Sequence, residues 1–332
     1  MAKENNKQTP SHKTTKQTKE IKKQTKKIAK EKKIEKKNVA KQNKQKAKNI
    51  ATHDETINSN ECKHIIDIYA TTNTLHKFRL REDYFDICKN YWLIEKYIAK
   101  YGLYDKESPA NTISAYDKAI EKGYPVTISV QMLKDFTLVC FAEKSLAHMT
   151  GLSGYLNNCT YDDIKDLSLL GTEHKIPTLQ EVLDHIGNKV EVVIDIINEL
   201  HCGKMEEMVL GIVAKYIEKY DCFGKVAIMS TNPRTLEYCA DSFPYVTRIL
   251  KVAQFKEKEY AEFKTKKLTK LKYYKLSKAD FIAYPSANLP YWRLKRKKTR
   301  GVIALSVKTQ EEYMRVSRYC DNIIFSEFEP KI

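Results

Sequence analysis

Short stretches of the chain alternate apolar and polar residues with the period of a β-strand. The clearest is Val126 to Gln131, with apolar residues at 126, 128 and 130 and polar residues at 127, 129 and 131, which predicts a strand. Further strands are predicted at 137–141, 191–197, 225–230, 245–250, 281–284, 302–307 and 322–325.

Helical spacing separates most of these strands. Between 111 and 123, Ile113, Tyr116 and Ala119 recur at helical spacing and Gly123 follows where a helix would end. Further helices are predicted at 179–186, 205–220 and 311–319. Alternation from about residue 96 onward indicates βα units, and eight or so units in about 235 residues match a (β/α)8 TIM barrel. A doubly wound open sheet is the alternative.

The positive charge is concentrated at the start of the chain. Residues 1–50 hold 18 Lys and 4 Glu, a net +14 of the +17 that the whole chain carries. Almost no apolar residue lies there, which predicts a disordered or transiently helical tail over residues 1–60. Closely spaced anions would bind such a tail, and nucleic acid, an acidic membrane surface and a cell-wall polymer all present them. A solubilising tail is the alternative.

Residues 61–95 are richer in aromatic and aliphatic side chains. They are predicted to form a lead-in segment that packs on the outside of the barrel or closes its base, and the barrel itself is assigned to 96–332. The eight Cys form no close CxxC pair, which indicates reduced thiols. No apolar run approaches the roughly 18–20 residues of a membrane span, and no signal-type segment follows the Lys-rich start. We therefore expect a cytoplasmic protein that can associate with an anionic surface.

Residues 97–103 have the sequence Tyr-Ile-Ala-Lys-Tyr-Gly-Leu. This stretch resembles the first strand of the glycerophosphodiester phosphodiesterase family, which has Ala followed by His, Arg and Gly. Lys100 therefore stands at the His position and Tyr101 at the Arg position. Residues 108–112, Ser-Pro-Ala-Asn-Thr, resemble the family's Pro-Glu-Asn-Thr, with Ala110 in place of Glu.

The resemblance continues to about residue 330. In the second strand, Thr127 and Ser129 occupy the positions of a Glu and an Asp, and after the stretch 138–141 Ala142 occupies that of the second His. In 193–197, Asp195 stands for a Glu and Ile197 for a Lys. A similar late strand carries Leu305 instead of Trp. Since the scaffold motifs persist along 96–330, the resemblance implies the TIM barrel of that family.

The altered positions are those that carry the family's chemistry. Its carboxylates bind Mg²⁺ or Ca²⁺, which polarises the phosphoryl oxygens, while two His act as general acid and base. Ala110, Thr127 and Ser129 remove three negative charges from one cavity, so the resemblance implies that neither metal nor catalytic residues remain. A lysine ammonium is a poor substitute for His because it keeps its proton near neutral pH. The expected function is a pseudoenzyme that binds a phosphate or another anionic ligand, or acts as a scaffold.

Two other functions stay open. One is an active phosphoric diester hydrolase of lipid metabolism with altered residues, working through Glu143 and Asp195, the acidic side chains left at motif positions. The other is binding of nucleic acid or an anionic surface through residues 1–50. The oligomeric state is left open.

The candidate ligand contacts in the cleft are Lys100, Asn111 and Lys134, together with Glu143 and Asp195. Lys134 is also ordinary turn material, and Asn111 is also able to cap the helix that follows it. Outside the motifs, residues 293–300 hold six basic residues after Tyr291 and Trp292, a composition found in surfaces that bind nucleic acid. A solvated barrel helix is the alternative for this segment.

Overall fold

The computed structural model describes residues 90–197, 203–252, 271–297 and 299–331. The tail predicted at 1–60 and the lead-in up to residue 89 lie outside these residues. The domain boundaries at 60 and 96 therefore stay predictions.

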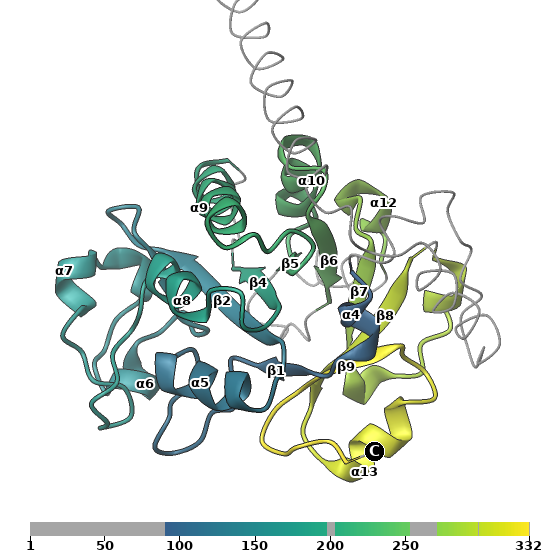
Figure 1. Cartoon of the computed structure of the whole chain (residues 1–332), viewed down its shortest axis with the longest axis horizontal. Coiled ribbons are helices and arrows are strands. Elements are labelled where there is room, and N and C mark those ends of the chain that lie inside the picture. Colours follow the sequence, from purple (N-terminus) through teal and green to yellow (C-terminus); the bar gives the residue numbers. More distant parts are fainter. Residues whose placement is uncertain (1–89, 198–202, 253–270, 298, 332) are drawn as a thin grey trace, which may run out of the picture. The chain divides into compact units, whose positions relative to one another are not determined.

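Eight parallel strands form a closed barrel (Figure 1). The ring order is β1-β9-β8-β7-β6-β5-β4-β2, and a pairing of β1 with β2 closes it. This closure excludes the open sheet and confirms the TIM barrel. The strands are β1 Ile98–Lys100, β2 Val126–Met132, β4 Val192–Ile196, β5 Val226–Ser230, β6 Thr247–Lys251, β7 Phe281–Pro285, β8 Gly301–Val307 and β9 Asn322–Phe325.

The strand predicted at 137–141 is present, but it is not one of the eight parallel barrel strands. Its ordered core, β3 (Leu138–Cys140), pairs antiparallel with the end of β2, with Val130 opposite Cys140 and Met132 opposite Leu138. Only a short turn joins the two strands, and antiparallel strands can follow one another through such a turn, whereas parallel strands need a crossover of a dozen or more residues.

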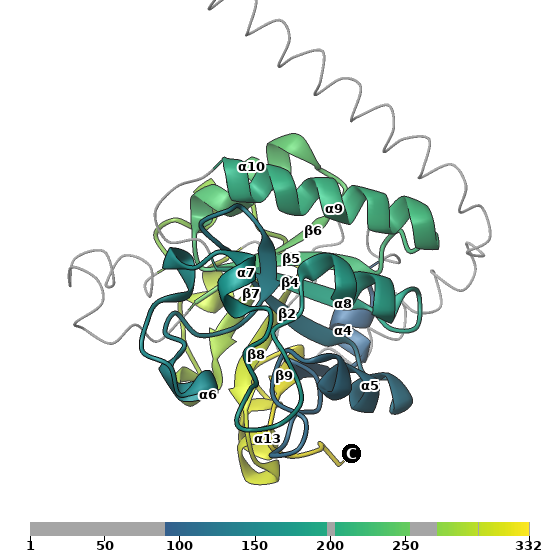
Figure 2. The same ribbon diagram turned by 90° about the vertical axis from the view of Figure 1, so that its left-hand side faces the viewer.

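Helices surround the barrel, and their ends follow from capping residues. Thr112, Thr178 and Thr309 each accept a backbone N–H in the first turn of a helix, and Asn232 caps a helix that begins with Pro233. The α-helices are α4 Trp92–Glu95, α5 Ile113–Glu121, α6 Ala147–Thr150, α7 Tyr161–Ile164, α8 Leu179–Ile186, α9 Lys204–Tyr220, α10 Pro233–Ser242, α12 Tyr274–Ser277 and α13 Gln310–Val316. The 3-10 turns are η1 Leu156–Asn158, η2 Ser286–Asn288 and η3 Leu294–Arg296. Figure 2 shows α9 and α10 side by side on the outside of the barrel.

No helix in the described ranges is long and apolar enough to pass through a bilayer.

The polar positions of β2 are buried, not solvent-facing. Thr127 and Ser129 are 1% and 0% exposed, and Ser129 lies in register with Asp195 of β4. Both faces of a strand in a TIM barrel are covered, by helices outside and by barrel side chains inside. The alternation in β2 therefore separates a helix-facing apolar side from a polar side directed into the barrel.

Short helix α4 contributes to the core at the amino-terminal ends of the strands. Its residues Trp92, Leu93 and Ile94 are buried in one cluster with barrel residues such as Phe281. The Trp92 indole N–H donates to the Gly224 carbonyl at 2.8 Å. The described part of the lead-in thus packs against the base of the barrel.

The segment 133–176 has a small hydrophobic core of its own. Leu146, Leu156 and Ile164 are among its buried members, and Leu133 and Phe141 join it from either side of β3. This segment, which we call the excursion, contains β3, α6 and α7, and the chain rejoins the barrel at α8.

Gly102 is the second residue after β1. We expect Gly102→Ala to lower the free energy of unfolding by about 2 kcal/mol or more. Gly102 has φ +82°, and a Cβ there would lie 2.5 Å from the Ala115 carbonyl oxygen. Gly123→Ala is the matched control, since Gly123 has φ +70° but no atom within 4 Å of the added Cβ. Urea unfolding of both variants separates the steric clash with Ala115 from the strain of a positive φ. Equal losses of unfolding free energy in the two variants would show that the clash contributes nothing.

Candidate functional site

A cavity of about 330 Å³ opens at the carboxyl ends of the barrel strands, the usual place for a TIM-barrel active site. Every barrel strand contributes to it. The lining residues of this strand-end cavity include Lys100, Tyr101, Thr127, Asp195, Met229, Lys251, Pro285, Ser286, Leu305, Ser306, Lys308, Glu312 and Ile324.

The floor of the cavity holds a buried ion pair between Asp195 of β4 and Lys251 of β6. The Asp195 side chain is 2% exposed and the Lys251 side chain 20%. Burial by itself would lower the pKa of Lys251, but the negative charge of Asp195, the neighbouring Tyr101 and the hydrogen bond to Asp195 together raise this pKa above its ordinary value. The carboxylate of Asp195 is therefore already neutralised by a cation from the protein.

Lys100 reaches into the cavity without a carboxylate partner of its own among the described residues. Its ammonium donates to the Ser306 hydroxyl at 2.9 Å and lies 5.0 Å from the centre of the Tyr101 ring. Ser306 stands at an irregularity in β8 between Leu305 and Val307 and has φ +58°, a conformation that non-glycine residues rarely adopt. This bulge presents the hydroxyl to Lys100.

A third lysine of the lining, Lys308, is also neutralised by a carboxylate. It forms an ion pair with Glu327, and this hydrogen bond raises the pKa of Lys308 and lowers the pKa of Glu327. Glu312 meets Arg315 at 3.7 Å and accepts the backbone N–H of Lys308. Lys100 thus remains as a cation of the lining without an ion pair.

Asn111, a predicted ligand contact, lies in the loop after β1 and is not among the residues that line the cavity. It is 2% exposed, and its side-chain oxygen accepts hydrogen bonds from the Ser129 N–H and the Tyr116 hydroxyl, both at 3.0 Å. The helix cap is Thr112, not Asn111. Asn111 therefore connects the loop to β2 and α5.

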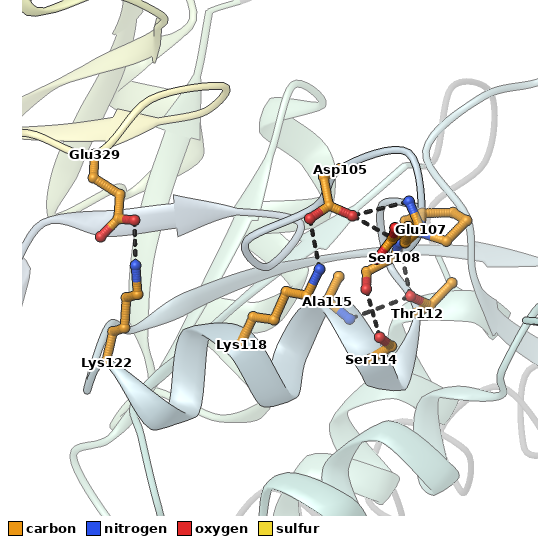
Figure 3. A network of polar contacts seen from close by, with 10 residues as sticks. Asp105, Glu107, Ser108, Thr112, Ser114, Ala115, Lys118, Lys122 and Glu329 are labelled. Carbon is orange, nitrogen blue, oxygen red and sulfur yellow. Dashed lines mark hydrogen bonds and ion pairs between the residues drawn. The ribbon is translucent and has the colours of Figure 1, made fainter.

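Polar contacts fix the loop that carries Asn111 (Figure 3). Asp105 accepts the Ser108 N–H at 2.9 Å and pairs with Lys118 of α5, and the bond from Lys118 lowers the pKa of Asp105. The hydroxyls of Ser108 and Ser114 lie 2.6 Å apart. The loop is thereby held against the start of α5.

The other residues predicted from the sequence lie outside the cavity lining. Lys134 is exposed in the turn between β2 and β3. Glu143 pairs with His148 at 2.7 Å on the surface of the excursion, beside Ala142. The structure therefore brings together Lys100, Tyr101, Thr127 and Asp195, but not Lys134 or Glu143.

The family model for glycerophosphoryl diester phosphodiesterases matches residues 104–323. The chain belongs to this family. It is similar to the uncharacterized protein YqiK of Bacillus subtilis (strain 168), with 27% identity over 42% of the chain and 60% of the relative. A glycerophosphodiester phosphodiesterase of Caldanaerobacter subterraneus subsp. tengcongensis is 29% identical over the same shares. The chain thus spans about 60% of the length of these curated relatives.

Solved glycerophosphodiester phosphodiesterases share the fold. An Oleispira antarctica phosphodiesterase, solved in complex with the product sn-glycerol-3-phosphate, has a TM-score of 0.56 and 17% identity, covering 71% of this chain and 94% of that one. At this identity the likeness concerns the fold.

The donor set in this member of the phosphodiesterase family does not fit a hard divalent cation. Ala110 has no donor atom, the Thr127 hydroxyl accepts the Tyr101 N–H at 2.9 Å, and the buried Ser129 hydroxyl has no hydrogen-bond partner in the described ranges. Asp195 is engaged by Lys251. Mg²⁺ and Ca²⁺ need several oxygen ligands with charge from carboxylates, and no metal-type group of three His, Cys, Asp or Glu occurs within the described parts of the chain.

Sequence reasoning missed Lys251 and Ser306. Lys251 follows Ile249 and Leu250 at the carboxyl end of β6, where polar residues of a TIM barrel meet, and this position could have indicated it. Ser306 offered no such signal, because its role depends on a bulge in β8.

Proposed function

We propose that this chain binds a phosphate-bearing ligand in the strand-end cavity without a metal ion and lacks the metal-dependent diester hydrolysis of its family. The observation that carries this proposal is the Asp195–Lys251 ion pair. The acidic side chain that lines the floor is neutralised by a lysine, and positions 110, 127 and 129 add no negative charge. The cavity therefore suits an anion better than a cation.

Lys100 is the proposed anchor for the ligand. It has no ion-pair partner in the described chain, and it is oriented by Ser306 and the Tyr101 ring. A charge-assisted hydrogen bond from an ammonium to a phosphate oxygen is stronger than a neutral one. The Oleispira phosphodiesterase was solved with sn-glycerol-3-phosphate, and we propose a ligand of this class for the present cavity.

Loss of proton transfer supports the same conclusion. Ala142, at a family His position, has no titratable group, and Lys100 replaces the other His. Losing one general acid or base costs about 10²–10⁴ in rate, and loss of the metal adds several kcal/mol to the barrier. A binding or scaffold role follows, with the tail of residues 1–50 as a proposed second contact to an anionic partner.

A cytoplasmic location also stays a proposal. The described cysteines Cys140, Cys159, Cys222, Cys239 and Cys320 are free thiols, which is ordinary for a reducing compartment.

Isothermal titration of the protein with sn-glycerol-3-phosphate in EDTA tests the binding. We expect Lys100→Met to weaken binding about 10- to 150-fold, since it removes a charged hydrogen bond. Lys225→Met is the control, because Lys225 precedes β5 at the opposite end of the barrel and contacts the Asn188 carbonyl. Equal affinities for both variants would show that Lys100 is not the anchor.

Hydrolysis of glycerophosphocholine and of an aryl phosphodiester, with Mg²⁺, with Ca²⁺ and with chelator, tests the lost activity. Product formation at the rate of a protein-free control is expected. Turnover that chelator abolishes would instead establish an active hydrolase with altered catalytic residues.

A further inference from the structure

Basic and aromatic side chains gather where the chain runs from β7 towards β8. They are Trp292, Arg293, Lys295, Arg296 and Lys297, with Lys275 of α12, and together we name them the basic-aromatic patch. The segment is not the barrel helix considered from sequence. It passes through a single 3-10 turn, η3, whose Leu294 is buried while Lys295 and Arg296 are exposed.

Trp292 is the centre of the patch. It is 54% exposed, and the guanidinium carbons of Arg293 and Arg296 lie 4.8 and 4.7 Å from its ring centre. Both distances are within the range of cation–π contacts. A large aromatic surface and two planar cations are thus presented together to solvent.

Three cations of the patch lack an acidic partner among the residues that the structure describes. Arg293, Lys295 and Arg296 form no ion pair with a described carboxylate, whereas some exposed lysines elsewhere do, as Lys118 with Asp105 and Lys219 with Asp184. Burial, followed by the charges of Arg293 and Lys275, lowers the pKa of Lys297. The positive charges therefore lie close enough to repel one another.

We propose that the basic-aromatic patch binds single-stranded nucleic acid, with a base stacked against Trp292 and the two guanidinium planes and with phosphates on the surrounding lysines. Base–aromatic stacking and guanidinium–base stacking need the flat surfaces present here. An acidic membrane surface fits less well, because the turn offers little apolar surface for insertion. Leu294 is 2% exposed, so the Trp292 indole is the exposed apolar group of this turn. This site is separate from the strand-end cavity and does not depend on its function.

The two tryptophans of the chain provide a direct test. Trp92 is 6% exposed and Trp292 is 54% exposed, so quenching by a stacked base reports on Trp292. We expect a 12-mer oligouridylate to quench the fluorescence of the full-length protein at 150 mM salt, while inorganic polyphosphate, which carries charge without bases, does not. The Lys-rich tail can attract both polyanions by charge. Quenching by oligouridylate alone therefore reports stacking of a base on Trp292.

Affinity is measured by anisotropy of labelled oligouridylate with full-length variants. Trp292→Ala is expected to weaken binding about 5- to 150-fold and Trp292→Phe to restore most of it. The pair Arg293→Lys and Arg296→Lys keeps the charge and is expected to lose about 2- to 5-fold for each stacked guanidinium. Arg318→Ala is the control, because Arg318 is an exposed cation that forms no ion pair with a carboxylate in the described part of the chain.

Three results would overturn the proposal. The first is equal affinity of Trp292→Ala and the unaltered protein. The second is equal quenching by oligouridylate and polyphosphate, or by neither. The third is a blue shift of Trp292 emission on phosphatidylserine vesicles without any response to oligouridylate, which would assign the patch to a membrane surface.

Discussion

Lys251→Met is expected to lower the free energy of unfolding by about 3–5 kcal/mol, the usual cost of removing one partner from a buried ion pair. The substitution leaves the Asp195 carboxylate, 2% exposed, without its cation. Urea unfolding at neutral pH measures the loss. The raised pKa of Lys251 means that the pair contributes fully below the ordinary lysine pKa of 10.5 and loses its contribution as pH rises through the higher folded-state value.

Two variants control this experiment. Asp195→Asn with Lys251→Met removes both charges, and we expect it to recover most of the stability because neither charge is left unpaired. Lys219→Met breaks the exposed pair with Asp184, whose side chains are 58% and 37% exposed, and should cost about 1 kcal/mol or less. A Lys251→Met protein as stable as Lys219→Met would show that Asp195 is hydrated in the cavity.

The second large effect concerns reconstruction of a hydrolase. The family side chains are restored by Lys100→His, Ala110→Glu, Thr127→Glu, Ser129→Asp and Ala142→His. We expect this variant to gain little metal-dependent hydrolysis while Lys251 keeps Asp195 neutralised and repels a divalent cation. Adding Lys251→Met should raise the metal-dependent rate about 10²-fold or more, since metal assistance lowers a barrier by several kcal/mol.

Rates with an aryl phosphodiester and shifts of the melting temperature by Mg²⁺ or Ca²⁺ are measured on both reconstructed variants. Binding to the folded protein alone stabilises it, so the shift reports metal binding even where turnover is slow. Equal rates and shifts with and without Lys251 would disprove the blocking role of this lysine.

The barrel could be predicted because its signals are local. The strand β9 and the helix α8 have the bounds predicted from the sequence, 322–325 and 179–186. The antiparallel direction of β3 could not be predicted, because a short apolar run has the same pattern in either direction.

The site was only partly predictable for a related reason. Motif positions located Lys100, Thr127 and Asp195, all of which line the cavity. The partner of Asp195 could not be predicted from the motif, because the family's lysine corresponds to Ile197, just after β4, whereas Lys251 belongs to β6, 56 residues from Asp195. Such a pairing depends on the order of strands around the ring, which periodicity does not contain.

The seam where β1 meets β9 has a consequence for synthesis on the ribosome. Ile98 is paired with Ile324, and the Asn322 side chain donates to the carbonyls of Leu93 and Lys96. The ring can close only after the last strand, β9, has been synthesised. The closing contact between β1 and β9 therefore has a high sequence separation. Until then the nascent chain exposes unpaired strand edges that are open to intermolecular pairing, so chaperone demand should be greatest just before residue 325 leaves the exit tunnel.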